Sequence, residues 1–171
     1  MVEFVNEPPW PQATTVIALD DLGPIRAADL AALEERRRPV LAVVRGQCSA
    51  DALALACMVD LLVAAPTASF GRPGPWTDLV LRRLSGITGR KVAGYLALSG
   101  RMVDAGRACR WGLVSSLAEN PAHEAVPLAE SLDRRSPVAV EVVLQRAHRG
   151  AAADHLRSGL MSWPWSEGAG T

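Results

Sequence analysis

Aromatic side chains are scarce in this sequence and make up only 5% of its residues. The hydrophobic fraction is nevertheless 49%, so the core must be built mostly from Ala, Val and Leu. No net charge remains, because 18 basic residues balance 18 acidic ones. Nucleic acids and anionic membranes usually select a basic surface, so this balance argues against both as partners. A length of 171 residues suits one domain with a substantial core and is short for two.

Cysteine is also rare, with only Cys48, Cys57 and Cys109, which lie far apart in the sequence. No pair has metal-ligand spacing, and an odd number cannot form a closed disulfide framework. We therefore expect small core residues in a reducing compartment, with no metal and no cofactor. The sequence also lacks a basic-then-apolar leader and any apolar run of membrane-spanning length. These absences favour a soluble, cytoplasmic protein.

The most informative stretch runs from Arg38 to Gly71. Residues 40–44 and 61–65 are continuous apolar runs, which are typical of parallel strands buried on both faces. Residues 50–60 between them lack a polar face, and this pattern indicates a central buried helix. A β-branched run at 14–19 and a short helix over 27–37 precede them. Alternation of strands and helices predicts an α/β fold with a parallel sheet and right-handed crossovers.

The rest of the chain is predicted to be mainly helical. Helices are expected over residues 77–84, 88–98, 104–110, 122–134 and 136–149, with a short strand within 112–117. Thr88 and Asp104 are expected to cap the helices that they precede, and Gly100 to end one. The predicted organisation is an irregular lead-in at 1–13, a single domain at 14–162 and an irregular tail at 163–171.

Three motifs in residues 16–144 resemble those of the crotonase (enoyl-CoA hydratase/isomerase) superfamily. RPVLAVVRG at 38–46 is similar to the family's strand of type KPVIAAVNG, and LLVAAPTASFG at 61–71 to its next strand and turn. LALSGRMVDAGRACRWGLV at 96–114 is similar to the family's LTG…A…A…GLV signature. The resemblance implies a crotonase-like spiral core of ββα units, with a parallel sheet and C-terminal helices.

The resemblance also implies a chemistry and a site. The family holds an acyl thioester, on CoA or a carrier protein, so that its carbonyl oxygen meets two backbone N–H groups, which stabilise an enolate. The family's Gly-Ala-Asp stretch matches residues 27–29, so Ala28 inherits one donor role. Its Gly triplet matches residues 50–52, so Asp51 inherits the other. The first N–H groups of a helix lack internal partners and attract negative charge, which independently supports the second assignment.

Both catalytic glutamates of the family's hydratases are replaced in this sequence. Ala54 and Gly74 stand at their positions, and a pair of carboxylates is what general acid–base addition of water requires. Asp51 and Asp78 are the candidate catalytic groups instead. Gly-Pro at 74–75 followed by Asp78 resembles the dihydroxynaphthoyl-CoA synthase branch, in which an Asp takes part in proton transfer. The commoner role of an Asp in the first turn of a helix is to stabilise the helix dipole, and this alternative applies to both residues.

Asp29, Gly74 and Trp76 are the candidate substrate-binding residues. Asp29 can instead hold its turn, and Trp76 can anchor its loop. His123, His148 and His155 are expected at the surface, because none has a partner at useful spacing.

Two functions remain open at the level of sequence. The first is an enzyme of isomerase or lyase type that binds an acyl thioester and stabilises an enolate. The second is a non-catalytic helper or assembly subunit for a related partner enzyme. The resemblance implies a homo-oligomer, possibly a trimer, in either case.

Overall fold

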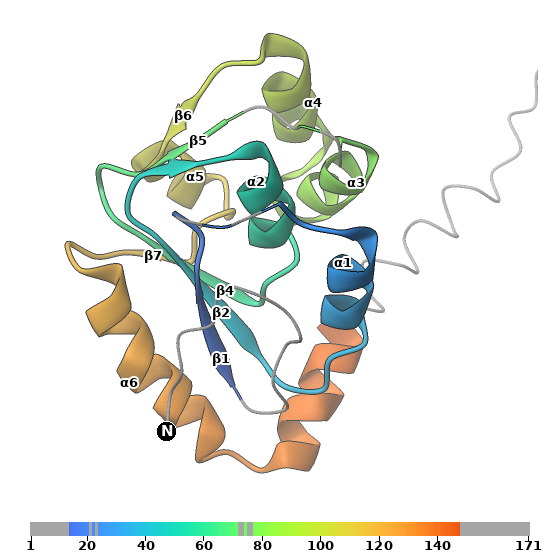
Figure 1. The fold of residues 1–171 in the computed structure, drawn as a ribbon, viewed down its shortest axis with the longest axis vertical. Coiled ribbons are helices and arrows are strands. Elements are labelled where there is room, and N and C mark those ends of the chain that lie inside the picture. The colour runs from blue at the N-terminus through green and yellow to red at the C-terminus, as the bar shows by residue number, and fades with distance from the viewer. Residues whose placement is uncertain (1–13, 21, 23, 72–73, 75–76, 148–171) are drawn as a thin grey trace, which may run out of the picture.

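Four parallel strands form the main sheet of the protein, in the order β1-β2-β4-β7 (Figure 1). The computed structural model describes residues 14–20, 22, 24–71, 74 and 77–147. The strands are β1 (Thr15–Ala18), β2 (Val40–Val44), β4 (Leu61–Ala64) and β7 (Ser116–Leu117). The first three coincide, to within a residue at each end, with the apolar runs of the sequence. The predicted parallel α/β architecture with C-terminal helices is therefore confirmed.

Two crossover helices connect these strands and are shorter than expected. α1 (Ala27–Glu34) ends before the run of three arginines, and α2 (Ala50–Ala56) ends four residues before the predicted boundary at Asp60. The Asp60 carboxylate accepts a hydrogen bond of 2.8 Å from the Val40 N–H. This bond fixes Asp60 at the start of β2, so the chain must leave the helix earlier.

A second, three-stranded sheet was not anticipated by the sequence. It contains β3 (Gln47–Cys48), β5 (Ser69–Phe70) and β6 (Val103–Asp104), in the order β3-β5-β6. Each strand has two residues, too few for a hydrophobic period to be visible.

The remaining helices are α3 (Thr77–Thr88), α4 (Arg90–Ser99), α5 (Ala105–Arg110) and α6 (Pro121–Asp133), followed by a helix whose described part is 137–147. Asp104 caps α5 by accepting a hydrogen bond from the Arg107 N–H, and Gly100 ends α4 in the left-handed conformation, both as predicted. The prediction that Thr88 caps α4 is wrong. Thr88 is the last residue of α3 and donates its hydroxyl to the Leu84 carbonyl.

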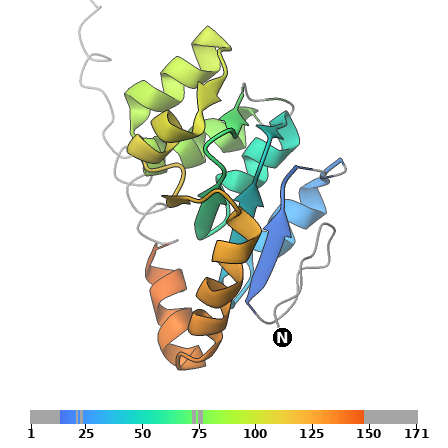
Figure 2. The ribbon, with the colours of Figure 1, turned by 90° about the vertical axis from the view of Figure 1, so that its left-hand side faces the viewer.

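The main sheet is buried on both faces. Val16, Leu41, Val43 and Val63 pack against Ala125 and Ala129 of α6. The alternate residues, among them Ile17, Ala42, Val44 and Leu62, belong to a larger cluster that includes α2. Figure 2 shows α6, in orange, on one side of the blue strand β1 and α1, in light blue, on the other. Every α2 residue from Ala52 onward is buried, which confirms the predicted central helix. The lead-in at 1–13, the tail at 163–171, Trp76, His148 and His155 lie outside the described residues.

Candidate functional site

The N-terminus of α2 is the first element of the candidate site. Ser49 caps this helix, and its hydroxyl accepts a 3.2 Å hydrogen bond from the Ala52 N–H. Asp51 follows two residues after the cap and is partly exposed. Ser49 was missed at the sequence level, although a Ser directly before an apolar helical run is a recognised start signal.

Gly74, which follows β5 in the sequence, lies against this helix terminus. A Cβ atom added at Gly74 would lie only 2.5 Å from the Ala50 Cβ, so glycine permits a close approach of the two backbones. The Thr77 hydroxyl donates a 2.6 Å hydrogen bond to the Gly74 carbonyl and fixes the end of the loop. A glutamate at position 74 would require the loop or the helix to move.

The second hydratase position is equally unable to supply a carboxylate. Ala54 is completely buried in α2, within the core cluster. Neither of the two hydratase positions therefore provides a carboxylate, because residue 74 is a glycine and residue 54 is a buried alanine.

The N-terminus of α1 contains the other candidate oxyanion donor. Ala28 is exposed in the first turn of this helix. The neighbouring Asp29 carboxylate accepts hydrogen bonds from the Arg26 N–H at 2.9 Å and from the Arg26 guanidinium at 3.1 and 2.9 Å. The bonds from the Arg26 side chain and backbone lower the pKa of Asp29. Asp29 is thus a buried carboxylate that forms a capping box with Arg26 at the N-terminus of α1. A contact between Asp29 and a substrate stays a prediction.

Asp78 lies on a groove between α1 and α3. Its side chain is 82% exposed and forms a 2.9 Å ion pair with Arg82, one turn further along α3. The groove has a volume of about 340 Å³. It is lined by Ala27, Leu30, Ala31, Glu34, Met58, Asp78, Leu79 and Arg82. The structure thus brings Asp78 to the helix that contains Ala28, whereas Asp51 is not among the residues that line this groove.

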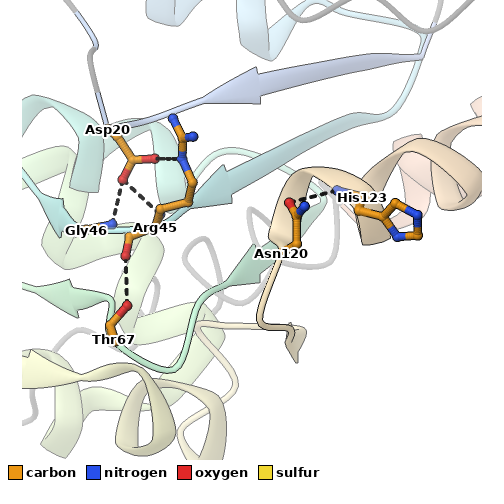
Figure 3. Close-up of polar contacts among 6 residues, drawn as sticks. All are labelled: Asp20, Arg45, Gly46, Thr67, Asn120 and His123. Carbon is orange, nitrogen blue, oxygen red and sulfur yellow. Dashed lines mark hydrogen bonds and ion pairs between the residues drawn. The ribbon is translucent and has the colours of Figure 1, made fainter.

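A carboxylate clamp at the carboxyl end of the main sheet was not predicted. Asp20, after β1, accepts hydrogen bonds from the N–H groups of Arg45 and Gly46 at 2.8 and 2.7 Å, and its second oxygen accepts one from the Arg45 side chain at 3.1 Å (Figure 3). Thr67, after β4, donates its hydroxyl to the Arg45 carbonyl. The clamp fixes the turn that leads from β2 into β3 and α2.

Other predictions for polar residues concern histidine, cysteine and metals. His123 is exposed as expected. Its backbone N–H donates a hydrogen bond to the side-chain oxygen of Asn120, which caps α6. Cys48 and Cys57 are buried as expected, and burial raises the pKa of both thiols, whereas Cys109 is only partly buried. Within the described residues, no cluster of three or more His, Cys, Asp or Glu side chains is placed to hold a metal ion. In that same part of the chain, no helix combines the length and apolarity that crossing a membrane requires.

Comparison with known proteins gives a consistent result. The family profile described as "Enoyl-CoA hydratase/isomerase" matches residues 23–161. A mevalonyl-coenzyme A hydratase of Aspergillus fumigatus is 33% identical over 133 residues, which are 72% of this chain and 49% of that protein. A carnitinyl-CoA dehydratase of Citrobacter koseri is 30% identical over 127 residues, which are 70% of this chain and 49% of the relative. The chain thus spans about half the length of the curated relatives it matches.

Solved structures show the same fold. A monofunctional enoyl-CoA isomerase from M. smegmatis superimposes with a TM-score of 0.75 at 24% identity, over 87% of this chain and 76% of the other. An enoyl-CoA hydratase from Mycobacterium avium gives a TM-score of 0.71 at 22% identity, over 85% of this chain and 66% of the other.

Proposed function

Because the chain belongs to the enoyl-CoA hydratase/isomerase family, we propose that it binds an acyl thioester, on CoA or a carrier protein, and catalyses an isomerase- or lyase-type reaction through an enolate. The observation that carries this proposal is the loss of both hydratase carboxylates. Ala54 is buried in α2 and Gly74 packs on Ala50, so neither position offers a general acid or base. Isomerisation or carbon–carbon bond chemistry needs a stabilised enolate but no pair of carboxylates around a water molecule.

In this proposal, the N–H groups of Ala28 and Asp51 bind the thioester oxygen as negative charge develops. Asp78 or Asp51 removes a proton from the carbon next to the carbonyl, and the resulting carboxylic acid returns it to another carbon. Asp29, Gly74 and Trp76 contact the substrate. The α1–α3 groove supports the role of Asp78, because this exposed carboxylate lines it together with apolar residues such as Leu30 and Leu79 and with Ala27, the neighbour of Ala28 in the sequence.

The test is turnover of 2-enoyl, 3-enoyl, malonyl-type and β-ketoacyl thioesters in D₂O, followed by mass spectrometry. We expect deuterium-labelled isomerisation or cleavage products. Asp51→Asn or Asp78→Asn should lower kcat by roughly 10²–10⁴-fold, the usual contribution of a positioned acid or base. Glu119→Gln, at an exposed residue outside the site, is the matched control. Products formed only by hydration, or turnover that neither Asp variant lowers, would overturn the proposal.

A second candidate function is a non-catalytic helper for a related enzyme. The contact of Gly74 with Ala50 favours it, because the family's Gly triplet is here Ala-Asp-Ala and Cβ atoms occupy space where a ligand would approach the backbone. Native mass spectrometry after co-expression with family members from the same genome tests this function. A stable hetero-complex of a protein that lacks turnover would support the helper. Activity in the isolated chain would exclude it.

Assembly and location complete the proposal. We expect a homo-oligomer, possibly a trimer, in the cytoplasm, with neither nucleic acid nor membrane as a partner.

A further inference from the structure

Asp20 is a largely buried carboxylate that joins the ends of two neighbouring strands. It follows β1, and its side chain is only 13% exposed. Because β1 and β2 are parallel neighbours, Asp20 lies at the same edge of the sheet as Arg45 and Gly46, which follow β2. Its carboxylate accepts hydrogen bonds of 2.8 and 2.7 Å from the N–H groups of these two residues (Figure 3). Hydrogen bonds to an ionised acceptor are roughly twice as strong as neutral ones, so Asp20 holds this turn firmly.

The backbone of the turn at Arg45 and Gly46 is hydrogen-bonded on both of its sides. The two N–H groups bond to Asp20. The two carbonyls accept hydrogen bonds from the Thr67 hydroxyl at 3.2 Å and from the Ser69 N–H at 3.0 Å. Backbone N–H groups are strong donors that need an acceptor in the folded state. Removal of the Asp20 carboxylate therefore takes the acceptor from both N–H groups and leaves the turn held from one side.

The turn that Asp20 holds leads directly into α2. Only β3 and the cap residue Ser49 lie between Gly46 and this helix. β3 pairs in parallel with β5, and Cys48 within it is buried, so this connection is itself held in place. Ser49 then accepts a hydrogen bond from the Ala52 N–H and sets the first turn of α2, which contains Asp51. A shift of the turn after β2 is therefore passed on to the first turn of α2.

We propose that Asp20 is a positioning residue for the oxyanion donors of the proposed function, on which this inference rests. Through the turn after β2, Asp20 fixes the N–H group of Asp51 relative to β1. β1 precedes α1, the helix that contains the other proposed donor, Ala28. Asp20 acts through the backbone that it holds and not by contact with the substrate. Such donors must lie about 2.7–3.1 Å from the oxyanion, and a misplacement of about 1 Å can lower the rate about 10²-fold.

Steady-state kinetics with acyl thioesters test the positioning role first. Asp20→Ala should lower kcat about 10²-fold and leave KM within about threefold of wild type, because the donors are misplaced only for the transition state. Asp20→Asn keeps an oxygen that accepts the two N–H groups, so its kcat should fall less, by about fivefold. Arg45→Met removes only the side-chain contact at 3.1 Å and should stay within about twofold of wild type.

The carbonyl group of bound butanoyl-CoA provides a second readout, which a loss of stability alone would not change. N–H donors polarise a thioester carbonyl, so infrared difference spectra of the carbonyl-labelled ligand should show a lower stretching frequency on the wild type. This shift should shrink markedly in Asp20→Ala, and Asp20→Asn should lie between that variant and the wild type. Asp104→Ala is the matched control, because it removes a carboxylate that accepts a 2.7 Å hydrogen bond from the Arg107 N–H. It should keep the wild-type shift and kcat.

Amide hydrogen exchange of the ligand-free proteins measures the structural coupling without any substrate. Asp20→Ala should accelerate exchange in peptides that cover the turn after β2 and the first turn of α2, because local opening there becomes easier. Asp104→Ala should accelerate exchange around α5 and leave the start of α2 as in the wild type. Circular dichroism verifies that the variants are folded, and Asp20→Asn decides the test if Asp20→Ala is not.

The outcomes separate this inference from the proposed function. Folded Asp20 variants that match an active wild type in kcat and in the carbonyl shift would overturn the positioning role and leave the proposed function standing. A wild type that neither shifts the carbonyl nor turns over thioesters would overturn the proposed function, and the positioning role with it. Exchange at the start of α2 that Asp20→Ala leaves unchanged would overturn the coupling through the turn, whatever the activity of the protein.

Discussion

At the scale of single residues, the helix caps show how far local sequence signals reach. Asp104 and Gly100 were predicted correctly, because a cap depends on the residue itself and its immediate neighbours. The prediction for Thr88 was wrong because the next residue, Gly89, adopts a φ of 85°, a conformation that strongly favours glycine. The turn between α3 and α4 therefore forms at Gly89, and Thr88 remains in the preceding helix. A Gly beside a possible cap is thus a competing signal that sequence reasoning must weigh.

Gly74 gives a prediction at the same scale. Gly74→Ala should destabilise the protein by about 1–3 kcal/mol, the usual cost of forcing an extra methyl group into a packed site. The cause is the 2.5 Å approach of the new Cβ to the Ala50 Cβ. Ala50→Gly removes that atom, so the double variant should recover most of the loss, and urea unfolding of all four proteins measures the coupling. Additive effects of the two substitutions would show that the loop does not rest on Ala50.

At the scale of elements, long buried strands were predicted well and short ones were not. β2 has the predicted bounds because a continuous apolar run of five residues is a strong signal. The two-residue strands of the second sheet were not predicted, because they are defined by pairing with partners distant in the sequence rather than by a residue pattern of their own. The end of α2 was misplaced for a related reason. Asp60 bonds to β2, a contact that its neighbours in the sequence do not reveal.

The ion pair between Arg36 and Asp60, just before β2 and β4, gives the next prediction. Arg36 has a side chain only 4% exposed, and its guanidinium lies 2.8 Å from the Asp60 carboxylate and donates to the Met58 carbonyl at 2.9 Å. Arg36→Met should lower the free energy of unfolding by about 3 kcal/mol, because it removes a cation that lies 2.8 Å from a carboxylate only 16% exposed.

The adjacent Arg37 offers a matched control for Arg36. It is 74% exposed and pairs with Glu141 at 3.3 Å, so Arg37→Met should cost less than about 1 kcal/mol. Chemical denaturation monitored by Trp fluorescence and circular dichroism measures both. Equal effects at the two positions would show that the contact of Arg36 with Asp60 contributes no more than a surface pair.

At the scale of the whole molecule, the sequence identifies the family and the candidate groups but not their spatial relation. Asp51 and Asp78 are equivalent candidates in the sequence, since each stands in the first turn of a helix. The structure separates them. Asp78 shares a groove with α1, whereas Asp51 lies at the α2 terminus on which Gly74 packs. Which carboxylate lines the groove depends on how the helices pack, and no local pattern encodes that arrangement.

The packing of the two clusters on opposite faces of one sheet predicts cooperative unfolding, which the cysteines can report. β2 contributes to both clusters, so neither face can open fully without disturbing the other. Cys48 and Cys57 are buried, and burial raises the pKa of Cys57 to about 12, whereas Cys109 is partly exposed. Iodoacetamide at about pH 8 should therefore alkylate only Cys109 in the native protein, because the thiolate is the reactive form.

The Cys109→Ser variant tests that cooperativity directly. Native labelling should nearly disappear, and the slow labelling of Cys48 and Cys57 that remains should proceed at one common rate set by global unfolding. Adding Arg36→Met should accelerate both by roughly 10²-fold, the factor that corresponds to about 3 kcal/mol when opening is in rapid equilibrium. Mass spectrometry of peptides resolves the two sites. Faster labelling of Cys48 alone would mean that the turn into α2, with the candidate oxyanion donor Asp51, opens independently of the rest of the core.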